Sequence, residues 1–175
     1  MAVPSMASAT ALRLKRQLPV YRESARRLVA EAGAALVDAK KADAKSCLSF
    51  YGRLIELSKT AATLRTPTES VFDDAETIVK HRKDLPEADG LLRQVRQLSE
   101  LLDDLAGKLQ LIEREARRIG DKSALLRKVK LEGKDAKFEA EFVKQFDAGM
   151  GVLGVFSVLL LFYRGFAARK SRYKV

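Results

Sequence analysis

Side chains that could carry out acid–base, nucleophilic or metal chemistry are scarce in this 175-residue chain, which has one His and one Cys. His81 lies in a charged stretch without a second ligand nearby, and Cys47 has no second thiol to pair with. The acidic pairs at 73–74 and 103–104 are consecutive, so a helix would point the two carboxylates of each pair in different directions. Because these groups could not jointly flank one substrate or one ion, we expect no catalytic residue, no metal site and no cofactor.

Glycines at 149, 151 and 154 spell G-x-G-x-x-G, the spacing of a dinucleotide-binding loop. That loop must follow a buried strand, whereas residues 137–146 have a charged, helical pattern, so the nucleotide interpretation fails. In a membrane helix, small residues let a second helix approach closely, and Gly151 and Gly154 therefore predict a packing face against a partner helix. The alternative is that these glycines occur by chance on a lipid-facing helix.

The net charge of +10 is concentrated at the two ends of the chain. Residues 1–40 carry seven basic and three acidic residues, and residues 148–175 carry five basic residues and no acidic one. Residues 41–90, in contrast, carry eight basic and nine acidic residues. A protein that follows nucleic-acid phosphates gathers its Lys and Arg on one folded face. We therefore expect no nucleic-acid partner.

The sixteen residues from Ala148 to Tyr163 contain no charged side chain. As a helix they would extend about 24 Å, and continuing to Ala168 gives about 31 Å, close to the thickness of a hydrocarbon core. This length predicts a membrane span, and a buried core helix is the alternative interpretation. Four residues are expected at the membrane–water interface: Tyr163, Arg164, Arg169 and Lys170. Basic residues flank the stretch on both sides, so its orientation in the membrane stays open.

Residues 1–20 contain basic residues, several Ser and Ala, and no acidic residue. This composition resembles a mitochondrial targeting sequence, and the alternative is the ordinary basic start of a helix. The tripeptide Val20-Tyr21-Arg22 is similar, with one mismatch, to the Leu-Tyr-Arg motif of small helical mitochondrial assembly factors and respiratory accessory subunits. In that family the motif opens a three-helix bundle. Here we expect Tyr21 to pack against a neighbouring helix.

The clearest periodicity lies between residues 91 and 119, where apolar residues alternate at spacings of four and three. The nine positions are Leu91, Val95, Leu98, Leu102, Leu105, Leu109, Ile112, Ala116 and Ile119. A repeat of about 3.5 residues keeps one face of a helix against a partner, so these positions predict a coiled-coil seam for helix docking. The partner is left open between the region Tyr21–Arg65, folding back, and a helix of another subunit.

Helical patterns also occur on both sides of the seam. Apolar spacing predicts one or two helices over residues 21–65, and Thr66 followed by Pro67 predicts the start of a new helix. Asp135 predicts the start of the last helix, after Gly133. Phenylalanines at 138, 142 and 146, followed by Met150, predict a ridge that lies either in a core or at the membrane interface.

These elements predict an all-α fold of long helices, with coiled-coil-like antiparallel packing and a single C-terminal transmembrane helix. We expect four parts along the chain. They are a basic, targeting-like segment (1–20), a soluble helical region (21–133), an amphipathic-to-transmembrane helix (134–168) and a basic tail (169–175).

This organisation resembles that of single-pass accessory subunits of mitochondrial inner-membrane complexes. The resemblance implies a non-catalytic subunit that docks on other subunits, is anchored by its span and contacts membrane lipids. A respiratory-chain complex is favoured over the ATP synthase. The alternatives are a tail-anchored coiled-coil adaptor of the mitochondrial outer membrane and a regulatory coiled-coil dimer.

Overall fold

The computed structural model describes residues 6–41, 47–119, 122–131 and 133–173, which are almost entirely helical. The helices are α1 (Met6–Lys41), α2 (Cys47–Lys80), α3 (Ala88–Ile119), α4 (Lys122–Leu131) and α5 (Ala136–Arg169), with the short 3-10 helices η1 (Arg82–Asp84) and η2 (Lys170–Tyr173). No strand occurs among the described residues. The predicted all-α fold is therefore confirmed.

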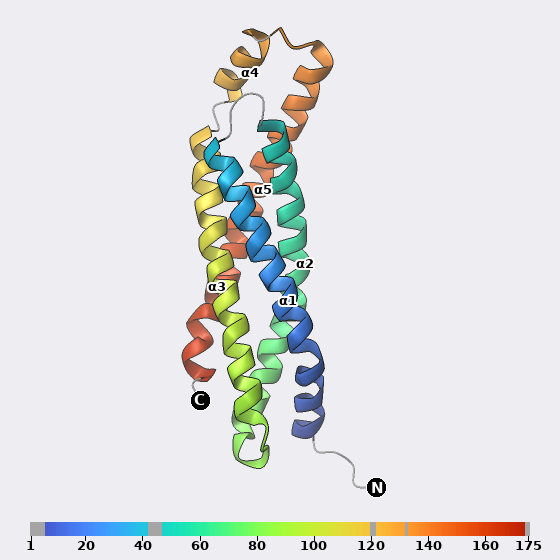
Figure 1. Cartoon of the computed structure of the whole chain (residues 1–175), viewed down its shortest axis with the longest axis vertical. Coiled ribbons are helices and arrows are strands. Elements are labelled where there is room, and N and C mark those ends of the chain that lie inside the picture. The colour runs from blue at the N-terminus through green and yellow to red at the C-terminus, as the bar shows by residue number, and fades with distance from the viewer. Residues whose placement is uncertain (1–5, 42–46, 120–121, 132, 174–175) are drawn as a thin grey trace.

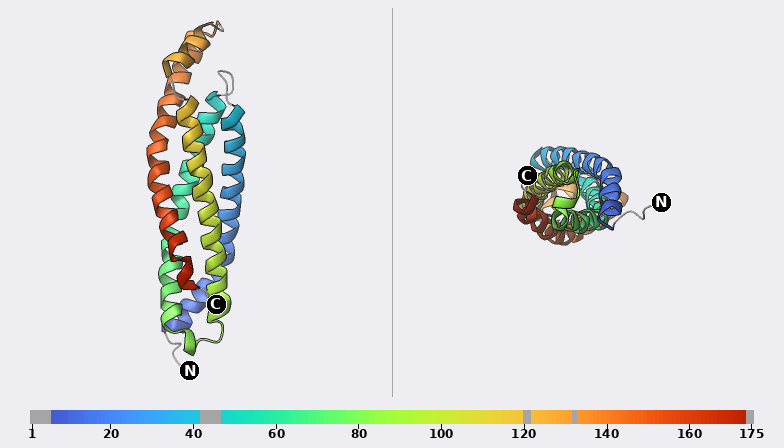
Figure 2. Two further views of the ribbon diagram at one scale, coloured as in Figure 1. Left: turned by 90° about the vertical axis from the view of Figure 1, so that its left-hand side faces the viewer. Right: turned by 90° about the horizontal axis from the view of Figure 1, so that it is seen from below.

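Four long helices lie side by side in an elongated bundle (Figures 1 and 2). α1 and α5 are at opposite corners, and each packs against both α2 and α3, which also touch one another. α1 and α3 run in one direction and α2 and α5 in the other (Figure 1). The predicted antiparallel packing thus holds for α1 with α2, for α2 with α3 and for α3 with α5, whereas α1 with α3 and α2 with α5 are parallel.

The bundle core is built from one apolar stripe on each long helix. In α3 the stripe is the predicted seam, which is buried from Leu91 to Ala116, while Ile119 packs half-buried against the core. α1 repeats the same spacing, mostly with small side chains, at Ala7, Ala11, Leu14, Leu18, Ala25, Leu28, Ala32, Ala35 and Ala39. Small side chains at the contact allow a short distance between helix axes.

The partner of the seam, which the sequence leaves open, lies within the chain. α1 and α5 cover the seam of α3 along the bundle. Of the two alternatives, the structure shows pairing within the chain, because the apolar side chains of the seam are covered by α1 and α5.

Residues 6–20, expected as a separate targeting-like segment, form the first half of α1 and pack into the bundle. Leu14 and Leu18 are buried, and Arg13 donates from Nε to Oδ2 of Asp74 at 2.7 Å and from Nη2 to Oδ1. Asp74 lies on α2 and is itself buried, so this ion pair joins the two helices. α1 therefore continues across residue 20 without a structural boundary, and residues 1–5 lie outside the described part. A targeting role for residues 1–20 stays a prediction.

α2 runs without a break from Cys47 to Lys80, so the helix start predicted at Thr66 and Pro67 is wrong. Proline in a helix interior removes one backbone hydrogen bond and usually ends or kinks the helix. Here the buried stripe continues on both sides, with Leu64 before the proline and Val71 after it. Burial on both sides outweighs the local preference for a break.

α5 begins as predicted, because Oδ1 of Asp135 accepts a hydrogen bond from the backbone N–H of Phe138 at 2.7 Å and caps the helix. Gly133, with φ of +69°, allows the chain to turn between α4 and α5. α4 and the first turns of α5 project as a hairpin beyond one end of the bundle (Figures 1 and 2).

Candidate functional site

α5 is the one described helix that is long and apolar enough to cross a membrane. The candidate span is Ala136–Gly165, and 33% of the residues in its most apolar window are buried inside the bundle. A helix that is apolar on all sides is normally surrounded either by protein core or by lipid. α5 therefore has more apolar surface than the bundle covers.

The inner face of α5 closes the bundle against α2 and α3. Its buried side chains are Phe142, Phe146, Leu153, Phe156, Leu159 and Tyr163. Of the predicted ridge, Phe142 and Phe146 are therefore in the core, while Phe138 and Met150 are half-buried against it. The buried face of α5 continues with heptad-like spacing at Leu153, Phe156, Leu159 and Tyr163.

Of the three motif glycines, Gly149 is the one at which α5 approaches another helix of this chain. A Cβ atom added to Gly149 would lie 2.5 Å from Cδ1 and 3.0 Å from Cβ of Tyr51 on α2. Gly151 and Gly154 are exposed, and no atom lies within 4 Å of the position of an added Cβ. They make no packing face inside the chain, so their role against a partner helix stays a prediction.

The outward side of α5 carries a row of exposed, uncharged residues, which we call the outer strip. It consists of Ala148, Gly151, Gly154, Val155, Val158 and Leu161. The exposed fractions rise along the helix, from 43% for Val155 to 55% for Val158 and 73% for Leu161. At about 1.5 Å per residue the strip is about 20 Å long. Exposed apolar rows of this kind mark surfaces for lipid or protein partners.

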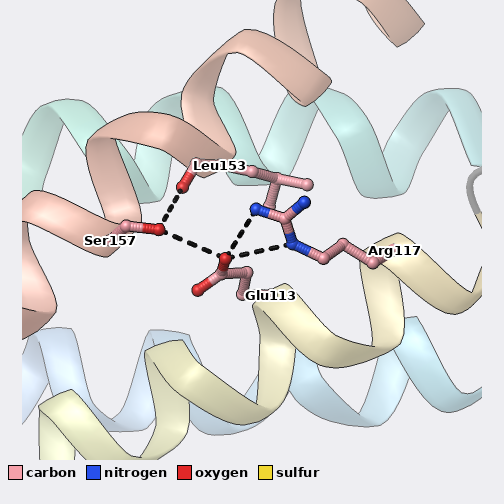
Figure 3. A network of polar contacts seen from close by, with 4 residues as sticks. All are labelled: Glu113, Arg117, Leu153 and Ser157. Atoms are coloured by element: carbon pink, nitrogen blue, oxygen red, sulfur yellow. Dashed lines mark hydrogen bonds and ion pairs between the residues drawn. The ribbon is translucent and has the colours of Figure 1, made fainter.

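A small polar network fastens the middle of α5 to α3 (Figure 3). Oγ of Ser157 donates to Oε1 of Glu113 at 3.2 Å and also lies 3.3 Å from the backbone oxygen of Leu153. The same oxygen of Glu113 accepts hydrogen bonds from Nη2 and Nε of Arg117, at 2.8 and 3.1 Å. The side chain of Glu113 is 17% exposed, so Arg117 balances a carboxylate that the apolar helix partly covers.

Within the bundle Tyr163 lies in the core, and its position at a membrane interface stays a prediction. Its hydroxyl donates to the backbone oxygen of Ala61 on α2 at 2.5 Å. The ring is buried because its position falls on the inner face, one heptad after Phe156. Phe162 turns toward α2, where the guanidinium of Arg65 lies 4.7 Å from the ring centre.

The basic residues after the apolar stretch are also engaged with the bundle. Arg164 is exposed and donates from Nη2 to Gln110 at 2.6 Å. Arg169 and Arg172 both face Glu76 of α2, with N–O distances of 3.5 and 3.6 Å. The side chain of Lys170 lies outside the described part. The charges predicted at the interface thus help to hold the end of α5 on α2 and α3.

The side chains considered for chemistry are dispersed. His81 is exposed before η1, with Nδ1 at 3.8 Å from Asp84. Asp74 is buried beside Arg13 while Asp73 is exposed, as expected for consecutive helical residues. The side chain of Cys47 lies outside the described part. Within the described ranges no group of three or more His, Cys, Asp or Glu side chains could hold a metal ion.

The outer strip is the surface that sequence analysis missed. The uncharged run from 148 to 163 is visible in the sequence, but the run alone does not show which side of the helix faces its neighbours. Comparison with protein-family models, curated proteins and solved structures finds no match to this chain. The class that the fold defines is an all-helical protein with one long apolar C-terminal helix.

Proposed function

We propose that this protein is a non-catalytic accessory subunit of a membrane protein complex, in which α1, α2 and α3 form the body and α5 is the membrane anchor. The observation that carries the proposal is that α5 is apolar on its outer face as well as on its inner face. A fourth helix of an ordinary water-soluble bundle needs only one apolar stripe. Contact with lipid explains the second apolar face of α5.

Anchoring requires α5 to exchange its bundle contacts for lipid. The neighbouring helices carry charged outward side chains, for example Glu56 on α2 and Arg114 on α3, and could not accompany α5 into hydrocarbon. The inner-face side chains of α5 are mostly Phe and Leu, which are as well accommodated by lipid as by a protein core. α1, α2 and α3 already contact one another and can close the gap that α5 leaves.

The proposed location is the mitochondrial inner membrane, and within it a respiratory-chain complex is favoured. The support for this location is the acid-poor composition of residues 1–20. Residues 6–20 are part of the bundle, so we propose that they are not cleaved off after import. Alkaline carbonate extraction of isolated mitochondria, followed by native gel electrophoresis in mild detergent, tests both parts. The protein should remain in the membrane pellet and migrate with a large complex.

A disulfide between α2 and α5 tests whether α5 is the anchor. The Cβ atoms of Tyr51 and of a residue introduced at Gly149 would be 3.0 Å apart, about 0.5 Å below the range of about 3.5–4.5 Å in disulfides, so a small outward shift of α5 brings the pair into that range. The variant Tyr51→Cys/Gly149→Cys, with Cys47→Ser to remove the native thiol, is added to neutral lipid vesicles before and after reduction. The reduced form should resist carbonate extraction, and the oxidised form should be released.

The outcomes separate the parts of the proposal. Release of the wild-type protein by carbonate would overturn the membrane anchor. Retention of the oxidised form to the same extent as the reduced form would show that α5 does not have to leave the bundle. Migration of the extracted protein alone on the native gel would favour an independent tail-anchored adaptor over a subunit of a complex.

A further inference from the structure

The hairpin of α4 and the first turn of α5 carries a second surface, separate from the outer strip. We call it the tip; it consists of Arg127, Lys128, Lys130, Leu131, Lys134 and Lys137, all of which are exposed. The tip projects beyond the end of the bundle, whereas the outer strip lies along its side (Figures 1 and 2). The two surfaces can therefore be tested independently.

The apex of the tip combines a strongly exposed leucine with positive charge. Leu131 is 87% exposed, the largest exposed fraction among the large apolar residues of the described chain. Lys130 precedes it, and Lys134 follows after the turn at Gly133, with Nζ at 5.2 Å from the ring centre of Phe138. Residues 122–137 contain six basic residues and two acidic ones, Glu132 and Asp135. Asp135 caps α5, while Glu139 and Glu141 follow in the first turns of α5, where Glu141 accepts a hydrogen bond from Gln145.

The hairpin is held to the bundle by buried apolar residues that belong to the same hydrophobic cluster as the bundle core, and α4 contacts α5. Leu125 and Val129 of α4 and Phe142 of α5 are buried. The backbone N–H groups of Gly133 and Lys134 donate to the carbonyls of Lys130 and Val129 and close the end of α4. The exposure of Leu131 thus follows from the turn geometry and not from the end of a free chain.

From this surface we infer that the tip binds anionic lipid headgroups, with Leu131 entering the interfacial layer and the surrounding cations facing phosphate. An exposed apolar residue ringed by Lys and Arg is the chemistry of peripheral membrane binding. Each basic side chain near an anionic surface raises affinity by about fivefold. A nucleic acid would offer the same phosphates, but it would not bury the leucine. This inference rests on the proposed membrane function and adds lipid selectivity to it.

Vesicle flotation with the oxidised Tyr51→Cys/Gly149→Cys/Cys47→Ser protein tests the tip while α5 is held in the bundle. The vesicles are pure phosphatidylcholine or phosphatidylcholine mixed with phosphatidylglycerol. The tip variant carries Lys128→Gln, Lys130→Gln and Lys134→Gln. The matched control carries Arg16→Gln, Lys80→Gln and Lys83→Gln, which remove the same charge from exposed residues toward the opposite end of the bundle.

The oxidised protein should float with the anionic vesicles and not with the neutral ones. The tip variant should lose on the order of 100-fold in partitioning, while the control should lose much less. Leu131→Ser should also weaken binding, with no change in net charge. Equal losses in the tip variant and the control would overturn the inference, because binding would then depend on total charge. Competition by a DNA duplex with no effect of Leu131→Ser would overturn it in favour of nucleic acid.

Failure of this experiment is distinguishable from failure of the anchor. Carbonate resistance of the reduced protein in neutral vesicles reports on α5 alone. If that resistance persists while the oxidised protein shows no preference for anionic lipid, the anchor stands and the tip inference is wrong.

Discussion

Gly149 on α5 faces the ring of Tyr51 on α2 so closely that an added Cβ atom would lie 2.5 Å from Cδ1 of the tyrosine. No real Cβ contact is that short, so the missing side chain is what allows these two parallel helices to meet. Tyr51 in turn packs edge-on against Phe146, with ring centres 5.1 Å apart. Among the described glycines, Gly149 is the one whose added Cβ atom would come closest to another helix.

Gly149→Ala should therefore destabilise the bundle by about 1–3 kcal/mol, the usual cost of overpacking a core. Gly151→Ala is the matched control, because its added Cβ meets no atom within 4 Å and alanine favours a helix by up to about 1 kcal/mol. Urea unfolding monitored by circular dichroism measures both. Equal effects of the two substitutions would contradict the close approach at Gly149.

The buried seam of α3 can be tested with a second matched pair of substitutions. Leu105 is fully buried, and Leu105→Ala should lower the free energy of unfolding by about 2–5 kcal/mol, because it removes buried methyl groups and leaves a cavity. Leu111 lies on the same helix but is 43% exposed, and Leu111→Ala should change stability by less than about 1 kcal/mol. Similar losses at both positions, measured by urea unfolding of the monomer, would show that the seam does not pair within the chain.

The ion pair between Arg13 and Asp74 makes residues 6–20 part of the folded protein. Arg13→Ala should cost about 1–3 kcal/mol, because it removes two charge-assisted hydrogen bonds from a buried carboxylate. Arg16→Ala, at an exposed neighbouring position, should have little effect. Thermal unfolding of both variants gives the comparison. A stability of Arg13→Ala equal to that of the wild type would contradict the role of this contact.

The same packing predicts that the mature protein keeps residues 6–20. Loss of residues 1–20 would remove the buried side chains of Leu14 and Leu18 and the partner of Asp74. We therefore expect the protein isolated from cells to retain this segment, as N-terminal sequencing or intact-mass measurement would show. Detection of a stable form that begins near residue 21 would contradict the packing of α1.

Tyr173 predicts a loss of stability at alkaline pH. Burial of its ring, together with the nearby carboxylate of Glu76, raises the pKa of the phenol to about 12, from an ordinary value of about 10. Because the folded-state pKa is the higher one, the contribution of this group is complete below about pH 10 and is lost as pH rises toward 12. Tyr173→Phe should therefore lose less stability than the wild type over this interval. Parallel pH profiles of the two proteins in urea unfolding would contradict the assignment.

The sequence predicts those features of the fold that depend on the spacing of residues along a single helix. The positions from Leu91 to Ala116 have the periodicity of a buried stripe, and they are buried. Asp135 has the side chain that caps a helix, and it caps α5. Such signals are local, because each depends on residues that lie within a few turns of one another.

What only the tertiary structure decided is how the stripes meet. Pro67 is a strong local signal for a helix boundary, but burial on both sides of it keeps α2 continuous. Tyr163 and Val158 belong to the same uncharged run, yet Tyr163 is buried against Ala61 while Val158 faces outward. The sequence by itself determined an all-helical chain with an apolar last helix. Contacts between residues about 100 positions apart, such as Tyr51 with Gly149, determined which face of that helix is buried and which stays exposed.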